Sequence, residues 1–184
     1  MQKNDSAGTP CLRPATNTDG NAVRTLVFEV LREYGLSPDP EGTNADLPKI
    51  EEHYRDGWFS VLEVNGQIIG SVGLLPLAET VMELRKMYLH RDWRGRGLGR
   101  LLLNQALDEA RKRGARRVVL GTARVLGEAV ALYKQSGFRP SQEKHPASRV
   151  DQAWELDLSE GGLRSLAQPL CFSTCSLLPF SWLF

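Results

Sequence analysis

The alternation of apolar and polar residues predicts a β-hairpin and a long helix in the middle of the chain. Residues 58–77 form two β-prone runs on either side of Asn65-Gly66, a dipeptide that type I′ turns favour because both positions need a positive φ. Residues 79–89 predict a third strand. From residue 98 to residue 110 apolar side chains recur at every fourth position, which indicates an amphipathic helix. Gly114 follows as its stop.

The flanking patterns complete a mixed α/β fold. Upstream, we expect a short strand at 11–16, a helix at 23–34 capped by Asp19 or Asn21 and ended by Gly35, a loop at 36–48 and a short helix at 48–57. Downstream, we expect a strand at 116–122, a helix at 128–137 and the last strands at 137–140 and 147–158. Antiparallel strands followed by β-α-β-α-β predict a mixed sheet with helices on both faces.

Size and composition are those of one globular domain. The 184 residues suffice for one hydrophobic core, 41% are apolar, 24% are charged, and a net charge of +1 gives no general attraction to nucleic acid. Three cysteines are too few, and odd in number, for a disulfide framework, and the polar N-terminus lacks the apolar core of a signal peptide. No segment reaches the roughly 18 apolar residues of a membrane span. We therefore expect a cytoplasmic protein.

The ends of the chain differ in character from the middle. We assign residues 1–10 to a disordered leader, 11–158 to the domain and 159–184 to an apolar C-terminal tail outside it. For the tail, three interpretations stay open: docking on the domain or on a homodimer partner, a peripheral hydrophobic anchor, or a stretch that belongs to no fold.

The stretch RGRGLGR, residues 94–100, combines glycine with positive charge at a strand-to-helix junction. Residues 85–100 hold six Arg or Lys and one Asp. A helix N-terminus has unpaired N–H groups that bind anions, and glycine lets phosphate oxygens approach the backbone. These features favour a di- or polyphosphate ligand. A solvated basic connection has the same composition.

Three phosphate-binding designs compete for this turn. A Walker A loop needs a Lys-Ser or Lys-Thr pair, which is absent here. Gly95 and Gly97 begin a dinucleotide-binding fingerprint, but Arg100 stands where its third glycine belongs. The pattern R-x-x-G-x-G is met by Arg94, Gly97 and Gly99.

Residues 84–114, which contain this pattern, and EAVALYKQSGF at 128–138 resemble the two signature motifs of the GNAT superfamily of acyl-CoA-dependent N-acyltransferases. The resemblance extends from about Leu12 to Leu158. It implies a central mixed, mostly antiparallel sheet of six to seven strands flanked by about four helices, with acetyl-CoA as co-substrate. It also implies that the turn binds the coenzyme pyrophosphate through backbone amides and basic side chains, a set consisting of Arg94, Gly95, Arg96, Gly97, Leu98, Gly99 and Arg100.

The same resemblance implies catalytic roles. The strand before the turn is expected to splay from its neighbour at a bulge, so that the Met87 amide binds the acetyl carbonyl and Leu89 pairs with pantetheine. Tyr133 stands at the position of the family's usual general acid. A phenol of pKa about 10 stays protonated at neutral pH and can therefore give a proton to the departing thiolate. Glu83 aligns with a glutamate base, and even spacing puts its side chain on the face of Met87. Arg85 lies between them, either as a surface ion-pair partner of Glu83 or as a group that holds a substrate carboxylate.

One departure concerns pantetheine: many relatives carry Asn seven residues before the helix tyrosine, where this chain has Leu126. The three histidines are scattered, so we predict no metal site.

The resemblance implies an amine acceptor, a small molecule or a peptide, bound near residues 36–56. Tyr34, Tyr54 and Trp58 are candidates for its wall. The segment 36–56 holds six acids against two bases, which favours a cationic amine, although a solvated loop has the same composition. The acids are Asp39, Glu41, Asp46, Glu51, Glu52 and Asp56. The alternatives to this enzyme are a non-catalytic acyl-CoA-binding module and, more distantly, a nucleotide-binding oxidoreductase.

Overall fold

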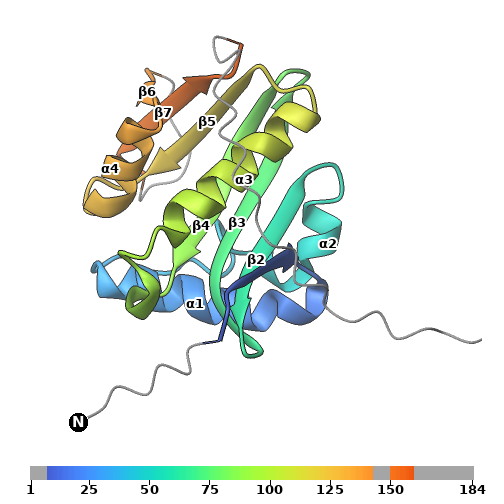
Figure 1. Ribbon diagram of the computed structural model, residues 1–184, viewed down its shortest axis with the longest axis vertical. Helices are drawn as coiled ribbons and strands as arrows, with labels where there is room; N and C mark the ends of the chain where they lie inside the picture. The colour runs from blue at the N-terminus through green and yellow to red at the C-terminus, as the bar shows by residue number, and fades with distance from the viewer. Residues whose placement is uncertain (1–7, 143–149, 160–184) are drawn as a thin grey trace, which may run out of the picture.

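The computed structural model describes residues 8–142 and 150–159, which form one sheet with helices on both faces (Figure 1). Its strands are β1 (Cys11–Pro14), β2 (Trp58–Val64), β3 (Gln67–Ala78), β4 (Val81–Leu89), β5 (Arg117–Thr122), β6 (Arg139–Pro140) and β7 (Gln152–Asp157). Its α-helices are α1 (Gly20–Glu33), α2 (Ile50–His53), α3 (Leu98–Lys112) and α4 (Gly127–Gln135), and its 3-10 helices are η1 (Asn17–Asp19), η2 (Leu47–Lys49) and η3 (Arg91–Trp93).

The seven described strands lie in the order β1-β2-β3-β4-β5-β7-β6. Every neighbouring pair is antiparallel except β4 and β5, which run parallel because α3 crosses between them. This arrangement confirms the predicted mixed, mostly antiparallel sheet with about four helices. The hairpin is confirmed too, since Asn65 and Gly66 have φ of 49° and 80°.

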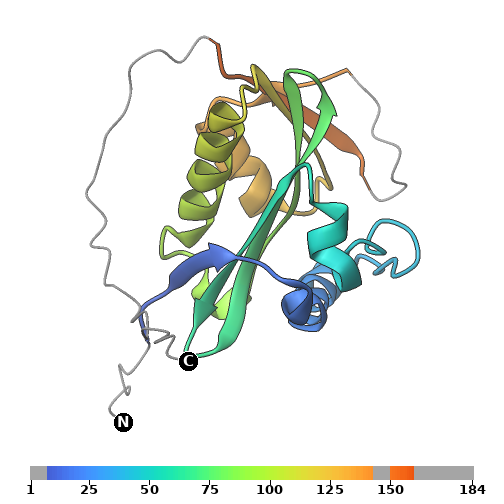
Figure 2. The ribbon, with the colours of Figure 1, turned by 90° about the vertical axis from the view of Figure 1, so that its right-hand side faces the viewer.

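Helices cover both faces of the sheet (Figure 2), and an apolar core lies on each face. One packs α3 and α4 against the sheet, with fully buried Leu102 and Leu103 at its centre. The other packs α1 and the segment around η2 and α2 against β2, with Val27 and Leu47 buried. The sheet therefore separates the two groups of helices.

The sheet opens between β4 and β5. The two strands pair only from Val81 to Glu83 and diverge beyond that point (Figure 1). On its other side, β4 carries a bulge: Tyr88 pairs with Ser71 and Arg85 with Gly73, so two residues of β4 stand opposite one of β3. The predicted bulge and splay are thus present.

The predicted leader and tail fall largely on residues 1–7 and 160–184, outside the described residues. Their boundaries and the homodimer stay predictions. Within residues 8–142 and 150–159, no helix combines the length and apolar character needed to cross a bilayer.

Candidate active site

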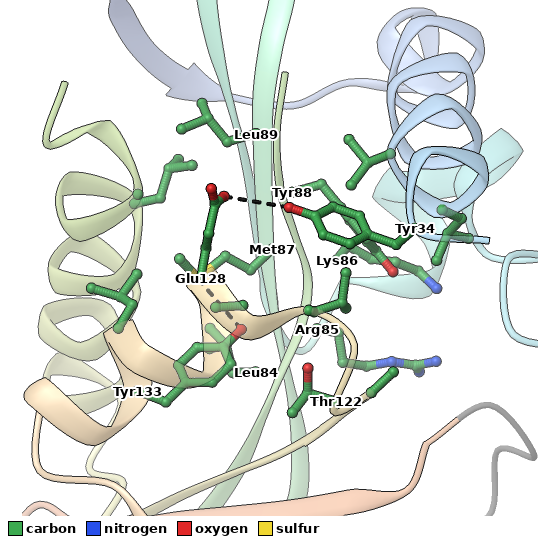
Figure 3. Close-up of a pocket in the computed structure, with 18 of the residues that line it drawn as sticks. Tyr34, Leu84, Arg85, Lys86, Met87, Tyr88, Leu89, Thr122, Glu128 and Tyr133 are labelled. Carbon is green, nitrogen blue, oxygen red and sulfur yellow. Dashed lines mark hydrogen bonds between the residues drawn. The ribbon is translucent and has the colours of Figure 1, made fainter. Parts of the chain in front are cut away.

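A cavity of about 560 Å³ occupies the gap between β4 and β5 (Figure 3). Residues from α1, β4, the glycine-rich turn, β5 and α4 form its wall. Most of the predicted site residues line this cavity. Those that do are Glu83, Met87, Leu89, Arg94, Gly95, Gly97, Gly99, Arg100 and Tyr133. Arg96 and Leu98 are not among the lining residues. Leu126, at the position of the expected Asn, lines the cavity as well.

The glycine-rich turn presents backbone rather than side chains. Gly95 and Gly97 have φ of 72° and 79°, and a Cβ built on either would meet no atom within 4 Å. Gly97 precedes α3, whose first hydrogen bond runs from the Leu101 amide to the Gly97 carbonyl. The three amides before Leu101 therefore have no helical acceptor. This open, amide-lined turn fits a pyrophosphate.

The arginine side chains of the turn have partners within the protein. Arg94 donates to both carboxylate oxygens of Glu33, at 2.7 and 2.8 Å, and to the Tyr34 hydroxyl at 3.0 Å. Its Nε donates to the Leu89 carbonyl at 3.1 Å, and the hydrogen bonds from Arg94 lower the pKa of Glu33. The charge of Arg94 is thus largely compensated, which the sequence pattern did not indicate.

Arg96 and Arg100 are also engaged. The Arg96 guanidinium lies over the Trp93 ring, 4.9 Å from its centroid. Arg100 donates to the Gln135 side-chain oxygen at 3.3 Å. The backbone amides are therefore the groups that the turn offers most directly to an anion.

Tyr133 lies on α4 with its hydroxyl aimed at β4 (Figure 3). The residue is only 5% exposed, and its hydroxyl donates to the Met87 sulfur at 3.9 Å. Burial raises the pKa of this phenol, so it is protonated throughout the neutral range. It can therefore supply a proton to an atom near Met87.

The bulge reverses which side chains share a face. Glu83 and Arg85 lie opposite Leu75 and Gly73, on the face that packs against α1 and α2. Met87, the second residue of the bulge, packs against the core under α3. The expectation that Glu83 and Met87 share a face is therefore wrong, because the extra residue shifts the alternation by one. Met87 still lines the cavity, together with Glu83 and Arg85.

A buried ion pair holds the bulge. Lys86 has a φ of 51° and a side chain that is 3% exposed. Its Nζ lies 3.1 Å from the Asp46 carboxylate and donates to the Thr43 carbonyl. The Tyr54 hydroxyl donates to Asp46 at 2.8 Å, and burial raises the pKa of Tyr54 well above its usual value. The bulge is thereby joined to the loop before α2, a contact that no local pattern revealed.

The acidic segment 36–56 was expected to form the acceptor wall, but its acidic residues do not line the cavity. Only Leu36 and Thr43 of this segment line the cavity, and none of its six acids does. Asp46 pairs with Lys86, and Glu51 accepts from the Asn17 amide at 2.8 Å. These two acids are used inside the fold, and the other four do not line the cavity. Of the aromatic candidates, Tyr34 lines the cavity, whereas Tyr54 and Trp58 pack in the cores.

Metal-ligand geometry is missing from the residues that the structure describes, where no three His, Cys, Asp or Glu side chains converge.

Known proteins resemble this chain in both sequence and structure. The sequence model of the acetyltransferase (GNAT) family matches residues 25–138. An uncharacterized N-acetyltransferase of Escherichia coli K12, YjgM, is 36% identical over 138 residues, covering 71% of this chain and 82% of the relative. The probable N-acetyltransferase camello of Xenopus tropicalis is 33% identical over 129 residues, covering 65% of this chain and 59% of the relative. The chain thus spans most of the bacterial relative and little more than half of the vertebrate one.

Solved structures share the fold at lower identity. A GNAT-family acetyltransferase of Staphylococcus aureus Mu50 superposes with a TM-score of 0.77 at 19% identity, covering 82% of this chain and 99% of the other. The PaiA N-acetyltransferase of Thermoplasma acidophilum, in complex with coenzyme A, gives 0.69 at 17% identity, covering 81% and 99%. Together with the family match over residues 25–138, these relatives show that the chain belongs to the acetyltransferase (GNAT) family, an acetyl-CoA-dependent class of enzyme.

Proposed function

We propose that this protein transfers the acetyl group of acetyl-CoA directly to a primary amine. The observation that carries the proposal is the single cavity that connects the glycine-rich turn, Glu83 and Tyr133 across the gap between β4 and β5. The low cysteine content fits a reaction in the reducing cytoplasm. The acceptor is a small molecule or a peptide.

The coenzyme would enter from the turn toward the centre of the sheet. The amides at the start of α3 and the partial positive charge of the helix N-terminus suit the pyrophosphate. The gap beyond Glu83 leaves the β5-facing edge of β4 without a strand partner, and this edge suits the pantetheine amides next to Leu89. The thioester carbonyl then lies at the Met87 amide.

The transfer needs one new bond and two proton movements. The amine nitrogen attacks the acetyl carbonyl carbon while Glu83 accepts a proton from the amine, directly or through water. The Met87 N–H stabilises the developing oxyanion, an interaction worth about 3 to 4 kcal/mol in comparable sites. The carbon–sulfur bond breaks, its electron pair goes to sulfur, and Tyr133 protonates the departing thiolate. Tyr133 is reprotonated from solvent.

Thermal unfolding with ligands tests coenzyme binding first. Saturation at about 100 times the dissociation constant stabilises the fold by roughly 2.7 kcal/mol, which is several degrees for a chain of this size. Acetyl-CoA and free coenzyme A are expected to raise Tm, whereas NAD and ATP are not. No shift with acetyl-CoA would contradict the assignment of the turn.

Thiol release with a panel of amines then tests transfer, with Tyr133→Phe as the matched variant. Loss of the acid is expected to lower kcat about 10²-fold or more, while the affinity for acetyl-CoA and Tm stay close to those of the wild type. The phenyl ring keeps the packing against Phe138, 5.6 Å away between centroids. Coenzyme binding without thiol release for any amine would instead indicate the non-catalytic acyl-CoA-binding module.

A further inference from the structure

Arg85 is a cation in the cavity wall with unused hydrogen-bond donors. Its side chain is 27% exposed, and its nearest acidic partner is Glu83, with 3.8 Å between Arg85 Nε and Glu83 Oε2. That distance is too long for a hydrogen bond. Within the described residues, no acceptor lies within hydrogen-bond distance of this guanidinium, which carries five N–H donors. A partly buried guanidinium whose N–H donors lack acceptors can donate hydrogen bonds to an acceptor group of a ligand.

The charges around Arg85 show what kind of ligand fits. Asp46 and Lys86 form the buried pair under the bulge and compensate each other. Glu83 and Arg85 are neighbours in the cavity wall, on the sheet face that packs against α1 and α2. A zwitterion can place its cation at Glu83 and its anion at Arg85, whereas a polycation would also meet the like charge of Arg85.

The spacing along β4 sets the distance between the two charges of the acceptor. The amine must reach both Glu83 and the thioester carbonyl at the Met87 amide, and Arg85 lies between these two positions on the strand. A carboxylate on the carbon next to the amine would therefore meet the Arg85 guanidinium. The planar guanidinium matches a carboxylate with two parallel hydrogen bonds.

We propose that the acceptor is a free α-amino acid whose carboxylate is bound by Arg85. This inference rests on the proposed acetyl transfer and specifies its substrate class. It distinguishes amino acids from peptide N-termini and polyamines, which carry no carboxylate beside the reacting amine. Arg85 is then the residue that determines acceptor specificity.

The test compares amino acids with their C-terminal amides, which keep the amine and side chain but lose the carboxylate charge. With saturating acetyl-CoA, thiol release gives kcat and KM for the proteinogenic amino acids and the matched amides. The wild type is expected to prefer at least one free acid over its amide by about 10- to 100-fold in kcat/KM, as for a hydrogen-bonded charged group.

Arg85→Gln is expected to remove this preference mainly by raising KM for the acid, with the amide changed less than about threefold. Arg85→Lys keeps the charge without the planar fork, so it should restore part of the preference. Arg24→Gln, at an exposed position on α1 outside the cavity wall, is the control and should behave as wild type.

The outcomes separate the inference from the function on which it rests. If the wild type acetylates amides as well as acids, or if Arg85→Gln slows both equally, the carboxylate assignment is overturned while acetyl transfer stands. If acetyl-CoA binds but neither series releases thiol and other primary amines do, the substrate class is wrong. If no amine releases thiol at all, the proposed function falls together with the inference.

Discussion

Lys86 combines three features that rarely occur together in one residue. It has a positive φ without being glycine, its ammonium is buried, and it belongs to the bulge beside the proposed oxyanion donor. The Ser71 hydroxyl donates to the Lys86 carbonyl at 2.7 Å, and Asp46 pairs with its ammonium. The surrounding structure therefore imposes the backbone conformation, and we infer that Lys86 positions the Met87 amide.

Lys86→Met tests this buried pair. Removal of one partner leaves the Asp46 carboxylate buried without its cation, which typically costs about 3 to 5 kcal/mol. We expect a loss of that size in the free energy of unfolding, measured by urea titration at neutral pH.

The double variant Lys86→Met/Asp46→Asn supplies the comparison. It leaves no unpaired carboxylate, so it should be more stable than Lys86→Met alone. Equal losses for the single and double variants would mean that the ion pair is not what holds the bulge.

At the scale of elements, α3 carries two glycines in equivalent conformations at its two ends. Gly97 precedes the helix with a φ of 79°, and Gly114 follows it with a φ of 77°. A Cβ on either would meet no atom within 4 Å. The two positions differ in surroundings, since only Gly97 lines the cavity.

Gly97→Ala and Gly114→Ala therefore form a matched pair. Each places a side chain at positive φ, which costs about 1 to 2 kcal/mol, so both should lower Tm by a similar amount. Only Gly97→Ala is expected to weaken coenzyme A binding, by about tenfold or more, because its Cβ enters the space proposed for the pyrophosphate. Gly97→Trp should abolish binding. Calorimetric titration measures the affinities, and unchanged affinity in both Gly97 variants would rule out this pyrophosphate site.

At the scale of the whole molecule, an ion-pair network ties the edge strand β1 to the start of α1. Arg13 donates to both oxygens of Asp19 at 2.8 Å and to Glu63 on β2 at 2.7 Å. The hydrogen bonds from Arg13 hold the pKa of Asp19 below its usual range. A depressed folded-state pKa stabilises the fold above the unfolded pKa, and this stabilisation is lost as the pH falls through the folded value.

Asp19→Asn is therefore expected to destabilise the protein at neutral pH, by about 1 to 2 kcal/mol for a hydrogen-bonded, partly exposed charge pair. The difference from wild type should shrink as the pH falls below about 4, where the unfolded carboxyl is protonated. Urea unfolding over this range measures both effects.

Asp108→Asn is the control. Asp108 pairs with Arg111 on the surface of α3, where the Asp108 side chain is 62% exposed and the Arg111 side chain 46% exposed. It should change stability little at any pH. An Asp19→Asn difference that does not depend on pH would contradict the electrostatic explanation.

The elements and their order were predictable because the signals are local. Asn65-Gly66 encodes its own turn through positive φ, and the periodicity of residues 98–110 encodes the buried face of α3. The glycine-rich turn and Tyr133 were identified in the same way, from short patterns that resemble a family, and the fold brings both to one cavity.

What the tertiary structure decided depends on contacts between distant segments. Arg94 binds Glu33 and Tyr34 at the end of α1, some 60 positions earlier. The bulge at Lys86 reversed the face assigned to Met87, because the alternation of a strand holds only while its pairing is regular. The composition of the acidic segment suggested an acceptor wall, yet none of its six acidic residues lines the cavity. The sequence by itself determined the main helices and strands, the fold class and the position of the glycine-rich turn, which depend on backbone preferences of a few neighbouring residues. Only the tertiary structure decided which charges compensate one another and left Arg85 and Glu83 together in the cavity wall, because charge compensation depends on distance in space.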